Sequence, residues 1–294
     1  MHAWSHGLPG RRWTGIASDF LIFAPVLCAA VASIVGSAHA RAAQLHTADG
    51  QAFERYTRVT EARMDRERNG EIPFLWMDQA DYAQRLNLQN RILRGEVVVS
   101  RLETREAGDR IRFAEALCHH WVGTIFVPGG RLDRVVALMQ TYERYQEIYS
   151  PAVRRSRTLS REGGHFTIYL QLFEKRIVSV VLNTESNVAY VPVTPTRMQV
   201  RSRSRRVAEV QYPDTPGERE RPVGLDAGFL WRFNNYCALD EREKGTFVQC
   251  ESVSLSRSVP VGLNWLVGRF ANAVPRESLE FTLGRLRDAL TRSG

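Results

Sequence analysis

Apolar and polar residues alternate along most of the chain after residue 110, and this two-residue period is typical of half-buried β-strands. The run Pro128-Gly129-Gly130 interrupts the alternation and is expected to end the first long strand. A second break at residues 240–245 ends on a glycine and predicts a hairpin turn. Strands are predicted at 97–99, 113–127, 165–173, 177–182, 188–193, 198–210, 229–239 and 247–255.

Two other segments have helical spacing. A stripe that ends before Pro151 predicts an amphipathic helix and consists of Leu132, Val135, Val136, Met139 and Tyr142. Near the end of the sequence, Pro275 suits an early helical position. It precedes a second stripe, made of Leu279, Leu283, Leu286 and Leu290. The order is therefore strand, helix, a long run of strands, and a closing helix.

The first forty residues have the layout of a secretory signal. Arg11 and Arg12 are followed by an apolar stretch at 20–36 and by small residues in Ala38-His39-Ala40. The apolar stretch, about 17 residues long, is marginal for a membrane span, so an uncleaved anchor is the alternative. We expect a signal peptide at 1–40, an N-terminal extension at 41–95 and the main domain at 96–294. The protein is then exported to the periplasm or cell envelope.

The extension is polar and charge-rich. Phe53 and Tyr56 have the spacing of a short helix, and Tyr82 and Leu86 that of another. Between them, the apolar patch at 72–77 is expected to dock on the main domain.

The element order resembles that of the START-like, or SRPBCC, superfamily over residues 118–294. Four segments carry the resemblance: HHWVGTIFVPG at 119–129, GFLWR at 228–232, PVGLNWL at 260–266 and PRESL at 275–279. It implies an α+β helix-grip fold, in which a curved antiparallel sheet wraps around the C-terminal helix and leaves a cavity between them. Members bind lipids, sterols, polyketides or hormones, and some are cyclases or hydrolases.

The predicted strand at 229–239 has an apolar face, with Phe229, Trp231 and Phe233. Its other face is polar, with Arg232, Asn234 and Tyr236. Either face could line the cavity, because pockets are mostly apolar with a few placed polar groups. Pairing of Arg232 with a carboxylate such as Glu251 is the structural alternative. The expected ligand-binding residues are His120, Trp121, Tyr169, Trp231, Arg232, Asn234, Tyr236 and Trp265.

The positions of histidine and cysteine in the sequence give only weak indications of a metal site or a disulfide. Neighbours on a strand point to opposite faces, so His119 and His120 cannot bind one ion together. Cys118 shares a face with His120, but no second ligand pair completes a zinc site, and we expect neither metal nor cofactor. Cys237 and Cys250 face each other in only one register of the 240–245 hairpin. Two separate core cysteines are the favoured interpretation, with a disulfide as the alternative.

The composition is that of a globular protein, with 294 residues, 44% hydrophobic and 24% charged. The net charge is +8, carried almost wholly by arginine. Arg201, Arg203 and Arg205 alternate along one strand and are interpreted as a solvated face, with contact to anionic lipid as the alternative. Nucleic acid is not expected as a partner, since interleaved aromatic residues are missing and the chain is expected to be exported.

The resemblance and the export signal together predict binding or transfer of a hydrophobic small molecule or lipid in the bacterial cell envelope. An anionic membrane surface is the alternative partner, and a monomer is expected. The alternative is a cyclase- or hydrolase-like enzyme that uses His120, Arg232 and Tyr236 in the same cavity. A third hypothesis is a structural envelope protein that binds through its N-terminal extension.

Overall fold

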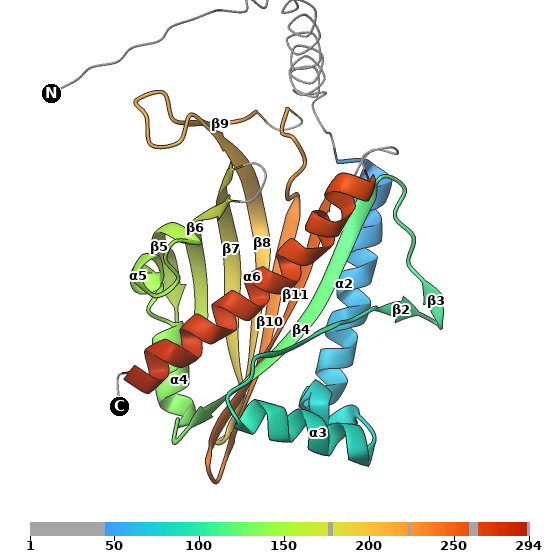
Figure 1. The fold of residues 1–294 in the computed structure, drawn as a ribbon, viewed down its shortest axis with the longest axis vertical. Helices are drawn as coiled ribbons and strands as arrows, with labels where there is room; N and C mark the ends of the chain where they lie inside the picture. The colour runs from blue at the N-terminus through green and yellow to red at the C-terminus, as the bar shows by residue number, and fades with distance from the viewer. Residues whose placement is uncertain (1–44, 176–178, 223–224, 259–263, 293–294) are drawn as a thin grey trace, which may run out of the picture. The chain divides into compact units, whose positions relative to one another are not determined.

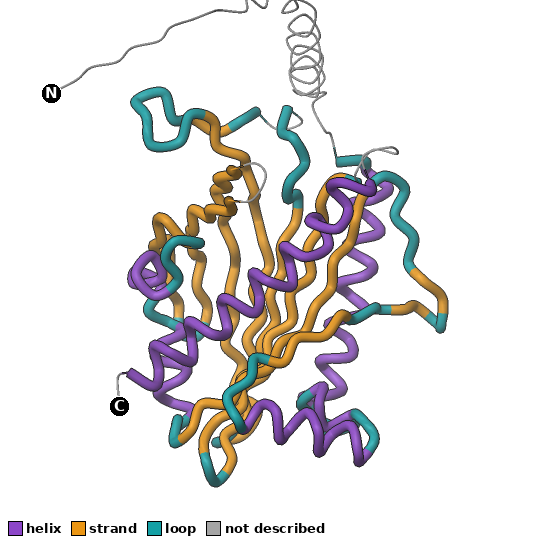
Figure 2. The backbone as a smooth tube through the Cα atoms, viewed as in Figure 1, coloured by secondary structure: helices purple, strands orange, loops and turns teal. Residues whose placement is uncertain are grey.

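A computed structural model describes residues 45–175, 179–222, 225–258 and 264–292, with side chains of the last segment described from residue 273. Within these residues, nine strands form one antiparallel sheet with the order β1-β4-β11-β10-β8-β7-β6-β5, and β9 pairs with β8 (Figures 1 and 2). The strands are β1 (Val98–Arg101), β4 (Ala116–Pro128), β5 (Val153–Glu162), β6 (His165–Lys175), β7 (Ser179–Thr194), β8 (Arg197–Gln211), β9 (Arg219–Glu220), β10 (Arg232–Arg242) and β11 (Gly245–Arg257).

A small hairpin, β2 (Arg105–Glu106) and β3 (Asp109–Arg110), lies outside this sheet. The helices are α2 (Thr47–Arg68), η1 (Trp76–Gln79), α3 (Tyr82–Leu93), α4 (Leu132–Met139), η2 (Tyr142–Arg144), α5 (Tyr145–Ile148) and α6 (Asn264–Arg292), where η denotes a 3₁₀ helix. None of the described helices is both long enough and apolar enough to span a bilayer.

Helix α6 crosses one face of the sheet, which we call the inner face (Figure 1). A Cβ on Gly123 of β4 would lie 2.5 Å from Cδ1 of Leu283, so the helix approaches the strand closely enough to require glycine there. The predicted stripe of the closing helix is confirmed, because all four of its leucines are buried. They share a core with residues such as Ile125, Leu239 and Val248.

Helix α2 lies on the opposite, outer face. Its Phe53, Tyr56 and Met64 share a core with Val253 and Leu255 of β11. The apolar patch at 72–77 is docked as predicted and contributes three buried side chains to the same face, those of Phe74, Leu75 and Met77. The sheet is therefore covered by helices on both faces, and the N-terminal extension supplies the outer layer.

Several sequence predictions need correction. The strands expected at 177–182 and 188–193 are one strand, β7, because the polar residues between them also pair with β6 and β8. The helix expected to begin near Pro275 starts at Asn264 and contains the proline. In α3 the buried residues are Leu88 and Ile92, whereas Tyr82 and Leu86 are exposed.

The two cysteines of the β10–β11 hairpin form a disulfide, so the expectation of separate core cysteines is wrong. The turn pairs Arg242 with Gly245, and this register places Cys237 directly opposite Cys250. The disulfide lies on the inner face beside Gly123, since Cys250 pairs with Gly123 across β11 and β4. Cys118 has a free thiol, and burial raises its pKa to about 12, so it is protonated at neutral pH.

Candidate functional site

The inner face changes character along the strands. In the rows nearest the β10–β11 turn it is apolar, with Ile125, Val248 and Leu239 paired across β4, β11 and β10. Two rows further along the strands, small polar residues replace them. One row runs across four strands through Trp121, Ser252, Asn235 and Ser202.

The next row is equally polar. It contains His119 and Ser254, which pair across β4 and β11, and Ser204 and Ser186, which pair across β8 and β7. We call these eight residues the inner polar patch: His119, Trp121, Ser186, Ser202, Ser204, Asn235, Ser252 and Ser254. The patch lies toward the end of β4 beside which α6 begins (Figure 1).

Apolar side chains border the patch. Phe233 stands between Ser254 and Ser204, while Val188, Phe166 and Ile168 continue the two rows toward the edge of the sheet. A filled core would carry large apolar residues throughout, as in the rows near the turn. Serines among aromatic and branched residues instead give a surface with both small polar and apolar groups.

His119 is the titratable group of the patch. It is 4% exposed, and burial together with the positive charge of Arg101 lowers its pKa to about 4. The imidazole is therefore neutral at physiological pH and offers one hydrogen-bond donor and one acceptor. Its Nε2 lies 3.4 Å from the Oγ of Ser256, a long contact that leaves most of this capacity unused.

Trp121 carries a buried donor without an acceptor. Its indole Nε1 is enclosed and has no hydrogen-bond partner in the described part of the chain. An unpaired buried N–H costs about 1–3 kcal/mol, so such groups are expected to have a partner in the functional state. An oxygen of a bound molecule would be a suitable acceptor.

Three of the sequence-predicted residues lie on the other face of the sheet. Tyr236 donates to Glu61 of α2 over 2.8 Å, and Asn234 donates to the hydroxyl of Tyr236 over 3.0 Å. Arg232 donates to the backbone carbonyl of Trp231 over 2.9 Å. They face α2 because Cys237, on the alternate face of β10, is turned toward α6. These residues therefore do not lie under the closing helix.

His120 also faces α2. Its Nδ1 lies 3.1 Å from the hydroxyl of Tyr56, and its Nε2 lies 3.0 Å from a carboxylate oxygen of Glu251. Arg63 donates to Glu251 and to Glu67, each over 2.5 Å. Glu251 is therefore paired with Arg63 and His120, not with Arg232. The cluster joins α2 to β4 and β11.

The two carboxylates of this cluster respond differently to burial. Burial raises the pKa of Glu67, and Arg63 opposes that shift. Burial would also raise the pKa of Glu251, but the positive charge of Arg63 and the hydrogen bond from His120 hold it below its usual value. A cation shared by two buried carboxylates is typical of a structural contact.

The remaining predicted residues are dispersed. Tyr169 lies on the outer face, where its hydroxyl donates to Asn183 over 2.8 Å. Trp231 is buried in the core shared with α2, and its Nε1 donates to Asp226 over 3.0 Å. The side chain of Trp265 lies outside the described residues. Of the eight predicted residues, the structure places Trp121 in the inner polar patch.

The serines of the patch were not selected from the sequence, although a signal was present. Ser252, Ser254 and Ser256 alternate with Val253 and Leu255 along β11. Such alternation indicates one polar and one apolar face, and a polar face is normally assigned to solvent. Here the serine face is the inner one, because the apolar residues pack against α2.

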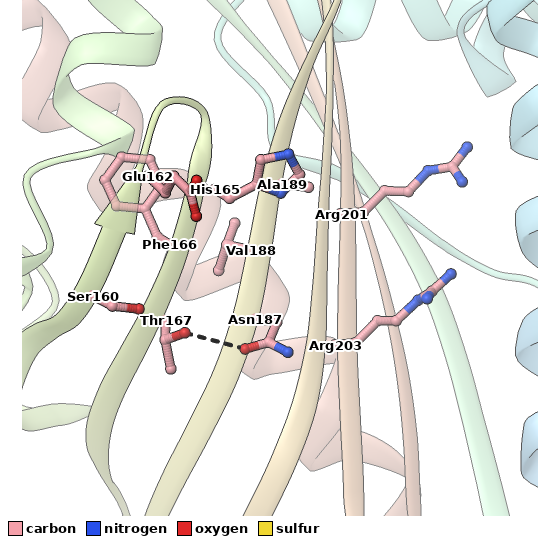
Figure 3. Close-up of a pocket in the computed structure, with 10 residues that line it drawn as sticks. All are labelled: Ser160, Glu162, His165, Phe166, Thr167, Asn187, Val188, Ala189, Arg201 and Arg203. Carbon is pink, nitrogen blue, oxygen red and sulfur yellow. Dashed lines mark hydrogen bonds between the residues drawn. The ribbon is translucent and has the colours of Figure 1, made fainter.

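The outer face carries a surface pocket of about 410 Å³ beside the β5–β6 hairpin (Figure 3). Thr167 donates to Asn187 over 3.3 Å within it, and the side chains of Arg201 and Arg203 point away from the hairpin residues. Both arginines form ion pairs with α2, to Asp65 and Glu61. The positive charge of β8 is therefore partly neutralised by carboxylates of α2. Metal-binding groups of three or more side chains are absent from the described residues.

Neither a protein-family model nor a curated protein matches the chain. Among solved structures, a STAR-related lipid transfer protein fragment from Xanthomonas axonopodis is 16% identical, with a TM-score of 0.43, and the match covers 66% of this chain and 98% of that one. A Streptomyces aromatase/cyclase is 12% identical, with a TM-score of 0.39 and coverage of 60% and 95%. Human STARD10 is 11% identical, with a TM-score of 0.38 and coverage of 71% and 81%.

At these sequence identities the similarity concerns the fold alone, and no function is inferred from it. The fold is evident from the chain itself: an antiparallel sheet begins with β1 and β4, continues after three short helices as a meander from β5 to β11, and is crossed by a long C-terminal helix. This connectivity and the packing of α6 on the inner face are those of a helix-grip fold.

Proposed function

We propose that the protein binds a mostly apolar molecule with at least one polar group at the inner polar patch, beneath the first half of α6. The observation that carries this proposal is the buried donor of Trp121 beside the neutral imidazole of His119, on a face whose rows nearer the β10–β11 turn form a hydrophobic core. A polar group of the ligand would meet these two side chains. Its apolar body would lie against Phe233 and Ile168.

The energetics of such binding require no special chemistry. Each 100 Å² of apolar surface removed from water contributes about 2.5 kcal/mol. The polar contacts then select the ligand, because a molecule lacking the acceptor would leave buried groups unpaired. His119 is the single titratable side chain of the eight patch residues, and the patch contains no carboxylate to orient and stabilise its imidazolium, as a catalytic triad would. Binding or transfer is therefore favoured over catalysis.

Native mass spectrometry of the protein purified from its own cells tests this proposal. We expect a co-purifying small molecule, and we expect Ser252→Phe to abolish it by filling the patch. Ser160→Phe is the matched control, because this serine is exposed on β5 and its substitution should leave the bound molecule in place. Absence of any bound molecule from the unaltered protein, or its retention in a folded Ser252→Phe variant, would refute the proposal.

A membrane is proposed as the source or destination of the ligand. The segment between β8 and β10 exposes three large apolar residues: Tyr212 at 57%, Leu225 at 53% and Phe229 at 47%. Arg219 stacks over the ring of Tyr212 at 5.1 Å. Exposed aromatic and aliphatic residues beside arginine are suited to the interface of an anionic bilayer.

Co-flotation with phosphatidylglycerol vesicles tests this contact. The double variant Leu225→Ser, Phe229→Ser should bind less. Leu159→Ser, which removes a leucine of β5 that is 43% exposed, should bind as the unaltered protein does. Equal flotation of the unaltered protein, the double variant and Leu159→Ser would contradict it.

Export to the cell envelope is also proposed, on the basis of the signal-like segment at 1–40. The Cys237–Cys250 disulfide supports it, since disulfides persist mainly in oxidising compartments. Amino-terminal sequencing of the protein recovered from a periplasmic extract would test it. A chain that begins at residue 41 is expected, and an intact amino terminus in the cytosolic fraction would contradict it.

A further inference from the structure

A second pocket lies on the outer face, where α2 passes over β8 and β10. Its volume is about 290 Å³, at the small end of the range for ligand sites. The charged residues in its lining are Glu54, Arg58 and Glu61 from α2, Arg203 from β8 and Arg232 from β10. The pocket is formed partly by the N-terminal extension, and its charged side chains lie on the face opposite the inner polar patch, with which it shares one lining residue, Ser204.

One pair of these charges is already satisfied. Arg203 donates through Nε to Glu61 over 2.6 Å and makes a second contact through its other nitrogen. The hydroxyl of Tyr236 donates to the same carboxylate. Glu61 therefore has three donors, and its negative charge is balanced by Arg203. Because their charges cancel, Glu61 and Arg203 together exert little net electrostatic force on a small ion.

The other charges are not balanced. Arg58 and Arg232 form no ion pair with any described carboxylate. Arg232 uses one guanidinium N–H for the carbonyl of Trp231, and its other donors remain available. Against these two cations the pocket offers one further carboxylate, that of Glu54, which is itself without an ion pair among described residues. Two cations and one anion leave an excess of one positive charge.

We propose that this pocket binds a small oxyanion, a phosphate ester or a carboxylate, between Arg58 and Arg232. Guanidinium groups match such groups because their donors form a planar fork. Asn234 has both ends of its amide engaged, with the backbone N–H of Ser204 and the hydroxyl of Tyr236, so it holds the floor of the pocket in place. The bound anion would cancel the excess positive charge, and Glu54 would weaken its binding.

Isothermal titration of the full-length protein with glycerol 3-phosphate at low salt tests the site. Saturable binding is expected, and Arg58→Gln and Arg232→Gln should each weaken it about tenfold or more. Glu54→Gln should strengthen it, because it removes a nearby negative charge. Arg55→Gln is the matched control, an exposed arginine of α2 that does not line the pocket.

A parallel titration with vesicles containing phosphatidic acid separates two sources of the anion. Binding to glycerol 3-phosphate assigns the site to a soluble ester, whereas binding to the vesicles alone, with the same response to the variants, assigns it to a lipid headgroup. Failure of both probes would overturn the proposal, as would an equal loss in Arg55→Gln. The two titrations do not depend on whether a ligand is bound at the inner polar patch, so failure of that proposal would leave their results unchanged.

Discussion

His119 should make the stability of the protein depend on pH, and this dependence can be removed by one substitution. In the folded protein its pKa is about 4, because burial and the charge of Arg101 disfavour the imidazolium. In the unfolded chain it has the ordinary value of about 6.5. Between these two values the unfolded chain binds a proton that the folded protein does not, so stability falls as the pH is lowered through this window.

The magnitude follows from the two values. A shift from about 6.5 to about 4 corresponds to roughly 3 kcal/mol once the pH is below both, and about 2 kcal/mol of that should already be lost at pH 5. Above pH 7 the imidazole is neutral in both states and contributes nothing to the pH dependence. The variant His119→Gln should lack this contribution, because glutamine does not titrate.

The assay is urea denaturation of ligand-free protein at pH 8 and at pH 5. The unaltered protein should lose about 2 kcal/mol more of its unfolding free energy than His119→Gln over this interval. His165→Gln, which removes an exposed histidine at the start of β6, is the control and should behave like the unaltered protein. Equal losses in the unaltered protein and His119→Gln would show that the imidazole is not enclosed on the inner face, and would refute the reasoning.

Three further predictions concern the packing around the sheet. Arg63→Met should destabilise the protein by about 3–5 kcal/mol, because it leaves two buried carboxylates without their cation, while Arg66→Met, at an exposed position of α2, should have little effect; equal urea midpoints would contradict this. Gly123→Val should cost at least about 1–3 kcal/mol, since its Cβ would lie 2.5 Å from Leu283, and an unchanged melting temperature would show that α6 is not held against β4. Cys237→Ser should lower stability by about 3 kcal/mol by opening the hairpin disulfide, and unchanged stability of this variant under oxidising conditions would argue against the bond.

Most of the elements could be predicted from the sequence because helical and strand periods are local, although β5 was not. The stripe of four leucines in α6 and the apolar positions Phe166 and Ile168 of β6 are buried as their spacing predicts, whereas β11 is buried on both faces. Interruptions were harder to predict. Residues 183–187 of β7 are polar and fell between two predicted strands. They nevertheless pair on both sides, because hydrogen bonds to two neighbouring strands hold a segment that has little apolar content.

The residues of the candidate site could not be predicted in the same way, because their positions depend on which helix covers each face of the sheet. Alternation along β10 separates Phe233 and Cys237 from Arg232 and Tyr236, but it does not say which helix covers which face. The sequence left open which face lines the cavity, and three residues of the polar face were among the expected ligand-binding residues. In the structure the polar face meets α2, which supplies Glu61 as partner for Tyr236. Helix α2, which lies outside the segment that resembles the superfamily, covers this polar face, where solvent or a ligand was expected.

Spacing along the chain was enough to predict most of the strands and helices, the burial of one stripe of α6, and the resemblance to the helix-grip fold, but neither β5 nor the continuity of β7. The remaining features depend on tertiary contacts. Pairing across the hairpin set the register that joins Cys237 to Cys250, and packing of α6 on Gly123 made the serine side of β11 the inner face. Both depend on contacts between residues far apart in sequence, where a shift of one residue exchanges the two faces of a strand.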